Sequence, residues 1–192
     1  NPGSESSPFS LQRYNSGYIN SKYLAQQHVL ENVARHELNA VIVNPTFIIG
    51  PFDRKPSSGK VILHALKRGV QWCPPGGKNF VHAFDVAQGI AAAYMHGTVG
   101  ECYLLAGENL SYEQFFEKIE HITNRSSFRI KIPKSLLLGA GSVGHAWNKA
   151  TGSRLALNKT NAALLTLDNY YTGDKANKKF NLTPRPIDEA IA

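Results

Sequence analysis

The chain has 192 residues, of which 42% are hydrophobic and 18% charged, and its formal net charge is +7. This composition is typical of globular proteins and excludes the disordered and fibrous classes. No run of residues approaches the roughly 18 apolar positions that cross a bilayer, so we expect no membrane partner. Cys73 and Cys102 lack the spacing of metal or redox sites, which predicts two buried free thiols in a reducing cytoplasm.

The positive charges are spread along the chain rather than gathered in a dense block. The nearest approach to a cluster is Lys175, Lys178 and Lys179, which we expect on a solvated helix. A nucleic-acid partner is therefore not expected. A basic balance instead suits solubility, or an anionic ligand such as a cofactor that carries phosphate.

The hydrophobic pattern first predicts a helix followed by a strand. After a loop rich in Pro, Gly and Ser, apolar residues recur at helical spacing from about Tyr18 to Leu38, and Asn39 is the expected C-cap. Residues 40–45 form a short, continuously apolar run, which is typical of a strand buried on both faces of a parallel sheet. A helix followed closely by a buried strand is half of a βαβ unit.

The next elements continue this alternation. Asp85 is the expected N-cap of an Ala-rich helix, Ser111 is expected to form a capping box with Gln114, and His82 is expected to be buried and satisfied. The alternation predicts an α/β domain with a helix-rich end. The expected elements are a helix at 60–68 stopped by Gly69, a strand near 80–82, a helix at 85–96, a strand at 101–106 and a helix after Ser111.

From Pro133 onward the chain is predicted to be mainly helical, with an interruption at Gly139–Gly144. These six residues spell G-x-G-x-x-G, the pattern of a dinucleotide phosphate loop. They follow no predicted strand, however, and no ribose-binding acidic residue lies about 20 positions downstream. We therefore expect a helix break rather than a phosphate site.

Tyr18 and Lys22 form a Y-x-x-x-K motif at the start of the first predicted helix, where the i, i+4 spacing places both side chains on one face. A phenol is a weak acid, and an ammonium group one turn away stabilises its phenolate, so such a tyrosine can exchange a proton with a carbonyl oxygen. The motif alone is weak, because chance predicts about 0.5 such pairs in this composition. A second pair, Tyr171 and Lys175, adjoins a turn sequence and is not expected to converge. For Tyr18 and Lys22 the alternative is a surface helix that carries a Tyr and a Lys without a catalytic role.

Three further segments follow the Y-x-x-x-K motif in a fixed order, at 43–53, 79–87 and 100–107. This series is similar to the extended short-chain dehydrogenase/reductases, the NAD-dependent epimerase/dehydratase superfamily. It most closely resembles the branch that contains dihydroflavonol 4-reductase, which the pairs Ser21-Lys22 and Asn44-Pro45 also fit. The resemblance extends from about residue 14 to residue 187.

The resemblance implies roles for individual residues. Tyr18 would be the catalytic acid/base, while Lys22 would hold the nicotinamide ribose and tune Tyr18. The backbone at the carboxyl end of the strand would meet the nicotinamide carboxamide, through Pro45, Thr46, Phe47 and Ile48. The cofactor would be NADP or NAD, with NADP slightly favoured, and no metal is expected. The pocket for a small-molecule substrate would be lined by Phe52, the loop Lys55–Ser58 and the helices after Pro133.

The same resemblance implies an α/β fold that is the C-terminal half of a Rossmann-type parallel sheet with a smaller, mainly helical substrate domain. Residues 1–50 would be the remnant of the dinucleotide-binding domain. Residues 51–192 would be mainly substrate domain, with 80–106 packing back on the Rossmann part. The catalytic Ser or Thr of the family, its first strands and its Gly-rich loop have no counterpart here. We therefore expect that the chain alone does not transfer hydride.

The function implied for the whole protein is a cytoplasmic NAD(P)-dependent oxidoreductase that reduces a carbonyl or oxidises a secondary alcohol. One alternative is a nucleotide-sugar epimerase or dehydratase, although the arginines usual in those relatives are replaced at Val41–Asn44 and Gly77–Val81. Another is a non-enzymatic dinucleotide sensor, although sensors often lose the Tyr or the Lys. Members of the family often dimerise through the helix of Tyr18, so a homodimer is compatible with the sequence.

Overall fold

The computed structural model describes the whole chain except residues 15, 55–57, 67–68, 154 and 156. Its helices are η1 (Leu11–Tyr14, a 3-10 helix), α1 (Gly17–Ala34), α2 (Lys60–Ala65), α3 (Ala83–His96), α4 (Tyr112–Thr123), α5 (Lys134–Thr151), α6 (Lys159–Leu164), α7 (Asp174–Phe180) and α8 (Asp188–Ile191). Its strands are β1 (Ile42–Pro45), β2 (Phe47–Ile49), β3 (Val70–Cys73), β4 (Gly77–His82), β5 (Cys102–Leu105), β6 (Glu108–Ser111), β7 (Phe128–Lys131) and β8 (Asp168–Asn169).

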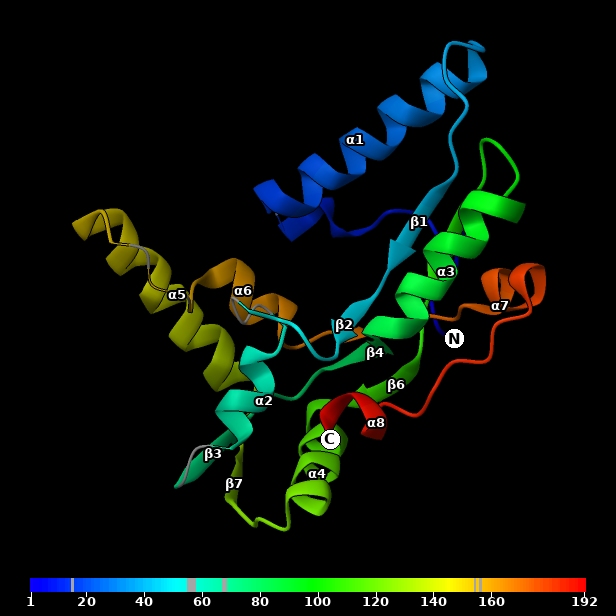
Figure 1. The fold of residues 1–192 in the computed structure, drawn as a ribbon. Helices are drawn as coiled ribbons and strands as arrows, with labels where there is room; N and C mark the ends of the chain where they lie inside the picture. Colours follow the sequence, from blue (N-terminus) through cyan, green and yellow to red (C-terminus); the bar gives the residue numbers. More distant parts are fainter. Residues whose placement is uncertain (15, 55–57, 67–68, 154, 156) are drawn as a thin grey trace.

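The strands form three small sheets in which parallel pairing predominates, as expected for the α/β class (Figure 1). β1 pairs in parallel with β5, and β3 pairs in parallel with β7. β4 pairs in parallel with β2 and β8 and antiparallel with β6. The chain passes from β1 into β2 through Thr46, whose backbone N–H donates to the Leu105 carbonyl at 3.1 Å. This junction joins the β1–β5 sheet to the sheet around β4.

Helix α1 begins at the N-cap Ser16, whose hydroxyl accepts a hydrogen bond from the Ile19 N–H. The predicted C-cap at Asn39 is wrong, because the helix ends at Ala34 and the chain turns at His36, which has a left-handed φ of 60°. The prediction that the strand at 40–45 is buried on both faces is also wrong. The residues of β1 are half-buried or exposed. Within the described residues β1 has a strand neighbour, β5, on one edge only, and no described residue of α1 is itself buried.

Helix α3 starts at His82, which is its N-cap and accepts the Phe84 N–H through Nδ1 at 3.0 Å. The prediction of Asp85 as the N-cap is therefore wrong. The Asp85 carboxylate instead accepts hydrogen bonds from the backbone N–H and the guanidinium of Arg185, a partner 100 positions away. His82 is buried and hydrogen-bonded, as predicted.

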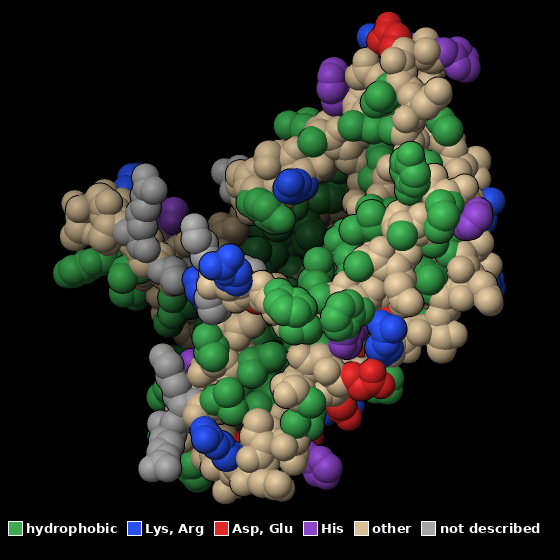
Figure 2. Space-filling view, in the orientation of Figure 1, with side chains coloured by type: hydrophobic (Ala, Val, Ile, Leu, Met, Phe, Trp, Pro, Cys, Tyr) green, Lys and Arg blue, Asp and Glu red, His purple; other side chains and the backbone are tan. Residues whose placement is uncertain are grey.

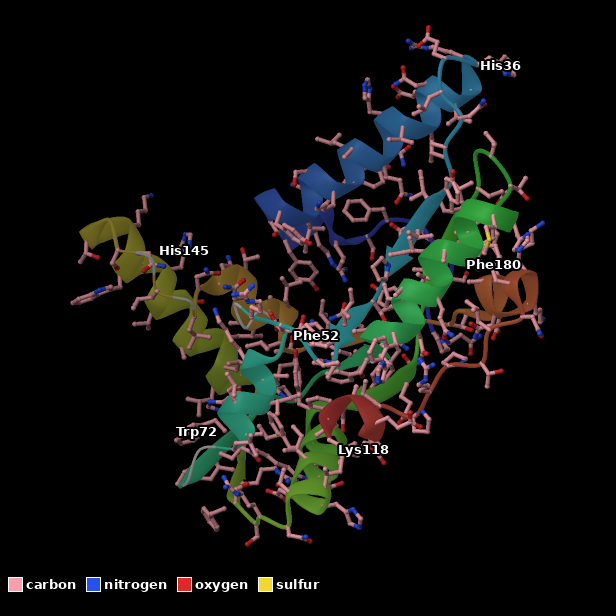
Figure 3. All side chains as sticks on the ribbon, in the orientation of Figure 1. His36, Phe52, Trp72, Lys118, His145 and Phe180 are labelled. Atoms are coloured by element: carbon pink, nitrogen blue, oxygen red, sulfur yellow. The ribbon has the colours of Figure 1, made fainter. Side chains whose placement is uncertain are left out.

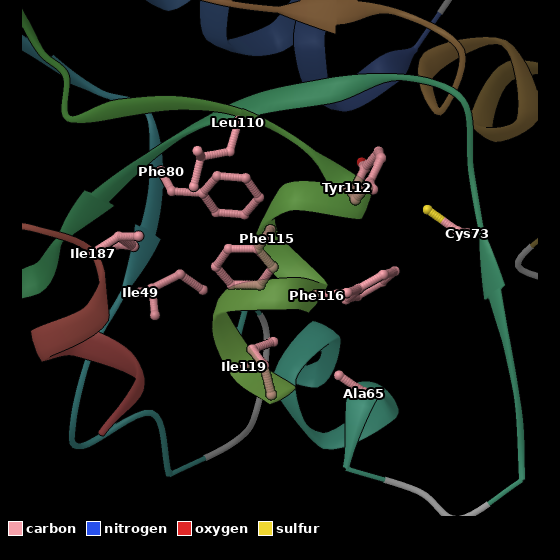
Figure 4. Close-up of a cluster of buried hydrophobic side chains, with 10 residues drawn as sticks. All are labelled: Ile49, Ala65, Cys73, Phe80, Leu110, Tyr112, Phe115, Phe116, Ile119 and Ile187. Carbon is pink, nitrogen blue, oxygen red and sulfur yellow. The ribbon is translucent and has the colours of Figure 1, made fainter. Parts of the chain in front are cut away.

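The main core lies where α4 packs against β2, β4 and β6 (Figure 4). Phe80 and Phe115 are buried and stack with ring centroids 4.0 Å apart, and Phe47 meets Phe80 edge to face. The predicted capping box at the start of α4 is present, because Ser111 and Gln114 each bond the other's backbone N–H. A second cluster forms where α3 and α7 cover β4 and β5, and it comprises Val81, Val86, Tyr103, Leu105 and Ala176.

The prediction of a helix break at Gly139–Gly144 is wrong, because α5 runs unbroken from Lys134 to Thr151. Two of these glycines let α5 approach the α6 segment closely. A Cβ added to Gly141 would lie 2.3 Å from the Ala162 Cβ, and one added to Gly144 would lie 2.1 Å from the Leu157 carbonyl oxygen. Helix–helix contact therefore explains these glycines, and a phosphate loop does not.

Two smaller expectations concern α2 and the cysteines. The helix predicted at 60–68 is found at 60–65, and Gly69 follows with a φ of 110°, while residues 67–68 lie outside the described residues. Cys73 and Cys102 are free thiols as predicted, but only Cys73 is fully buried, and Cys102 is half-buried.

Candidate functional site

Tyr18 and Lys22 lie on the first turns of α1 and converge, as their spacing predicts. The Lys22 Nζ lies 5.9 Å from the centre of the Tyr18 ring. Both side chains are exposed, Tyr18 to 73%, so the phenol is open to any ligand that approaches the start of the helix. The Ser21 hydroxyl donates to the Tyr18 carbonyl at 2.8 Å and so holds the first turn.

The second Y-x-x-x-K motif has structural contacts instead. The Lys175 ammonium pairs with Glu101, donates to the Cys102 carbonyl at 2.8 Å and lies 4.8 Å above the Tyr103 ring. The backbone of Tyr171 bonds the side chain of Asn109, and burial raises the pKa of its phenol. Lys175 therefore ties α7 to β5, the backbone of Tyr171 is held by β6, and the Tyr171 phenol is not exposed.

The carboxyl end of β1 lies beside the helix that carries Tyr18. The Asn44 side-chain amide donates to the Gln26 Oε1 at 3.1 Å, which links β1 to α1. Gln26 stands one turn after Lys22 on the same face of the helix. Sequence reasoning noted the Asn44-Pro45 pair but missed Gln26, although the i, i+4 spacing from Lys22 was a readable signal. Pro45 itself is exposed at this end.

The predicted cofactor contacts at Thr46, Phe47 and Ile48 are restricted by the fold. Both donors of Thr46 are used internally, since its N–H bonds Leu105 and its hydroxyl donates to the Asn79 Oδ1 at 2.7 Å. Phe47 and Ile48 are half-buried and pack against the two core clusters. A cofactor contact from this segment would therefore come from other backbone atoms. The cofactor role of the segment stays a prediction.

Asn79 on β4 is a polar residue that sequence reasoning did not single out. It is 1% exposed. Its Oδ1 accepts from the Thr46 hydroxyl and the Gly107 N–H, and its Nδ2 lies within 3.2 Å of acceptors on Gly107, Asn109 and Tyr171. Asn79 thus fixes the β1–β2 junction to two other segments. No local sequence signal marks this role.

A polar cavity of about 310 Å³ opens at the start of α1, between α5 and α6. Its walls are the side chains of Ser16, His145, Asn148, Asn158, Thr160 and Asn161. Ser16 is the N-cap of α1, and Tyr18 follows two residues later but is not among the wall residues. The helices after Pro133 therefore line a cavity at the N-cap of the helix that carries the predicted acid/base. Figure 2 also shows the surface hollowed below α1, where the visible side chains are mostly hydrophobic.

The other predicted pocket residues do not line this cavity. Phe52 is 86% exposed near the end of β2 (Figure 3). Residues 55–57 of the predicted loop lie outside the described residues, while Ser58 is half-buried. Among the described residues no cluster of His, Cys, Asp and Glu is arranged to hold a metal. In the same part of the chain no helix is both long and apolar enough to cross a membrane.

Comparison with known proteins identifies the class. Residues 1–106, more than half of the chain, match the NAD dependent epimerase/dehydratase family. The chain belongs to this family.

Individual relatives add detail. A putative dihydroflavonol 4-reductase from Synechocystis sp. is 29% identical over 187 residues, which cover 95% of this chain and 54% of that protein. The crystal structure of gox2253 is 31% identical with a TM-score of 0.81 and is matched over 99% of this chain and 58% of that one. A nucleoside-diphosphate-sugar epimerase from Pseudomonas aeruginosa, PA4631, shares the fold with a TM-score of 0.75 at 21% identity, over 99% of this chain and 58% of that one. The chain therefore spans about half the length of the relatives that it matches.

Proposed function

We propose that this chain is the catalytic-helix and substrate-binding part of an NAD(P)-dependent oxidoreductase that reduces a carbonyl, or oxidises a secondary alcohol, of a small molecule. One observation carries the proposal, namely the convergence of Tyr18 and Lys22 at the exposed start of α1 in a chain of this family. The dinucleotide-binding half would complete the site. NADP is the cofactor proposed first, and NAD the second.

Each residue would have a distinct part in the reaction. In the reductive direction the Tyr18 hydroxyl donates its proton to the substrate oxygen, and in the oxidative direction the phenolate takes the proton of the alcohol. The Lys22 ammonium stabilises the phenolate and has donors left for ribose hydroxyls. The nicotinamide supplies or accepts the hydride when it is bound. The open setting of Tyr18, Lys22 and Pro45 fits such a group, whereas the internally bonded donors of Thr46 do not serve it.

The cavity beside Ser16 supports a polar substrate of low charge. Its described walls carry amide, hydroxyl and imidazole groups but no Lys or Arg. A nucleotide sugar carries a diphosphate, which is usually bound by cationic side chains. The wall chemistry thus favours a carbonyl or alcohol substrate over a nucleotide sugar. The shared fold with PA4631 keeps the epimerase as the second candidate.

The test combines cofactor binding with Tyr18→Phe. The chain alone is titrated with NADPH and NADH, following energy transfer from Trp72 and Trp147, and no saturable binding is expected. In a polypeptide that also carries the dinucleotide-binding half, Tyr18→Phe should lower kcat by at least ~100-fold, as for loss of a general acid. The affinity for NADPH should stay within about twofold, because the phenol hydroxyl is only one of many contacts to the cofactor.

The control is Tyr171→Phe, which alters the second Y-x-x-x-K motif and should leave turnover unchanged. Turnover that survives Tyr18→Phe would remove Tyr18 from the mechanism. Dinucleotide binding by the wild-type polypeptide without turnover on any carbonyl or alcohol would favour the sensor. Saturable binding by the chain alone would show that a dinucleotide site exists without the second half.

A further inference from the structure

The polar cavity at the N-cap of α1 has walls that the protein's own hydrogen bonds hold in place. Thr160 of α6 donates its hydroxyl to the Tyr14 carbonyl at 3.0 Å, which fixes α6 to the segment that leads into α1. Asn148 of α5 accepts the Leu155 N–H at 2.9 Å and donates to the Leu155 carbonyl at 3.2 Å. None of these contacts needs a ligand, so the cavity is already formed before a ligand arrives.

Most of the hydrogen-bonding groups on the walls are used by the same contacts. The Ser16 hydroxyl accepts the Ile19 N–H as the cap of α1, and the Asn158 Oδ1 accepts the Asn161 N–H as the cap of α6. Both polar atoms of the Asn148 amide are bonded to the segment that follows α5. Recognition of a ligand by side chains therefore depends on the wall groups that these contacts leave over.

His145 of α5 is a wall residue whose side chain takes no part in these contacts. Within the described residues its imidazole forms no hydrogen bond, ion pair or ring contact. The residue is exposed, and Figure 3 shows it on the side of α5 nearer the start of α1. A neutral imidazole has one donor and one acceptor nitrogen, and both are available here. The Asn158 Nδ2, for which the described structure also gives no partner, adds a second donor to the same walls.

The available groups and the neutral character of the described walls indicate which kind of ligand group fits. A carboxylate or a phosphate accepts hydrogen bonds only and is usually met by cationic side chains, and no described wall residue is Lys or Arg. An apolar group would remove water from the polar walls and give them no partner in return. A hydroxyl group both donates and accepts, which matches an imidazole that offers one donor and one acceptor.

We propose that this cavity binds a neutral, hydroxyl-bearing part of the substrate and that His145 is the residue that recognises it. The inference rests on the proposed function and defines its substrate class, a carbonyl compound or alcohol with at least one further hydroxyl group away from the reacting carbon. The reacting oxygen would meet the Tyr18 hydroxyl, in the turn that Ser16 caps, while the further hydroxyl bonds the His145 ring. His145 would determine specificity and take no part in the transfer of proton or hydride.

The first test measures binding to the chain itself by nuclear magnetic resonance of the histidine rings. The probes are xylitol, a neutral polyol, and pentan-1-ol, which has the same carbon skeleton with a single hydroxyl group. The His145 signals should shift saturably with xylitol, at a concentration at least ~5-fold lower than with pentan-1-ol, since one net hydrogen bond contributes up to about tenfold in affinity. The His121 ring, exposed on α4 and not part of the walls, should not respond. A His145 signal that xylitol does not shift, or that both probes shift equally, overturns the proposal.

The second test measures specificity in a polypeptide that also carries the dinucleotide-binding half. Its substrates are pairs of methyl ketones of increasing chain length, each with and without a terminal hydroxyl group. At one chain length the hydroxylated ketone should have a kcat/KM at least ~10-fold above that of its unsubstituted partner. The difference should lie chiefly in KM, because a contact away from the reacting carbon stabilises the bound substrate and the transition state equally. The favoured length measures the span from Tyr18 to the cavity.

Two replacements of His145 separate recognition by hydrogen bonding from a structural role. His145→Leu removes both the donor and the acceptor, so the hydroxylated and unsubstituted ketones should then differ by less than about twofold in kcat/KM. His145→Gln retains a donor and an acceptor and should keep at least about a third of the wild-type preference. The matched control is His121→Leu, at an exposed histidine outside the cavity, and it should leave the preference unchanged. Circular dichroism checks that each variant is folded.

The outcomes distinguish this inference from the proposed function. If Tyr18→Phe abolishes turnover while the two ketones of every pair are used equally, the proposed function stands and the role of the cavity is wrong. Turnover that survives Tyr18→Phe removes the proposed function, and the preference in His145→Leu then still decides whether the cavity binds the hydroxyl group. Equal loss of preference in His145→Leu and His145→Gln overturns recognition by hydrogen bonding. Xylitol binding to the chain, with a preference in the longer polypeptide that His145→Leu does not alter, overturns the substrate role.

Discussion

Replacing the buried Asn79 by Leu should destabilise the fold more than any exposed Asn replacement. Leucine has the same number of side-chain heavy atoms as asparagine but cannot form hydrogen bonds with the groups that now meet the Asn79 side chain. Gly107 would lose the partner of both its N–H and its carbonyl, which bond Asn79 at 2.8 and 3.0 Å. The Thr46 hydroxyl keeps a longer contact with the Leu105 carbonyl at 3.4 Å, so it is only partly orphaned.

The magnitude follows from the two groups on Gly107. A buried donor or acceptor left without a partner costs about 1–3 kcal/mol. Gly107 is half-buried, so water compensates in part, and we expect a loss of about 2–4 kcal/mol in the free energy of unfolding. For a chain of this size each kcal/mol lowers Tm by about 2–4 °C. The expected fall in Tm is therefore about 10 °C.

The assay is urea denaturation followed by far-UV circular dichroism, with thermal unfolding as a second readout. Thr46→Val removes one hydrogen bond of the same network and should cost about 1 kcal/mol. Asn39→Leu, at an exposed position between α1 and β1, is the control and should change stability by less than about 0.5 kcal/mol. If Asn79→Leu costs no more than Asn39→Leu, the polar network around Asn79 does not hold the β1–β2 junction.

Two further predictions concern the glycines of α5 and the cysteines. Gly144→Ala should destabilise the chain by about 1–3 kcal/mol through overpacking. Gly139→Ala should stabilise it by up to about 1 kcal/mol, because an added Cβ there meets nothing within 4 Å. Thermal unfolding that ranks the two variants the other way would contradict the α5–α6 contact. Burial raises the pKa of both thiols above its ordinary value, so little thiolate is present near neutral pH. With a chromogenic disulfide the half-buried Cys102 should react before the buried Cys73. The rate at Cys102 should still rise as the pH passes the ordinary pKa of a thiol, about 8.5. A Cys73 that reacts first would contradict its placement in the core.

Local patterns in the sequence determined much of the fold and the centre of the candidate site. The convergence of Tyr18 and Lys22 depends only on helical spacing, and the capping box of Ser111 and Gln114 spans four residues. Both were predicted and both are present. The parallel pairing of β1 was also predicted from its apolar run.

Contacts between residues far apart in the chain decided the rest. Asp85 is of a residue type that often caps helices, but its carboxylate instead accepts hydrogen bonds from Arg185, 100 positions later. In the sequence the glycines of α5 resemble a helix break. In the structure two of them allow the close approach of the α6 segment, because they have no side chain. In the sequence Thr46 resembles a free donor, but in the structure its hydroxyl donates to Asn79, 33 positions away. Sequence patterns report local preferences, whereas these partners are chosen by packing and hydrogen bonding that exist only once the chain has folded.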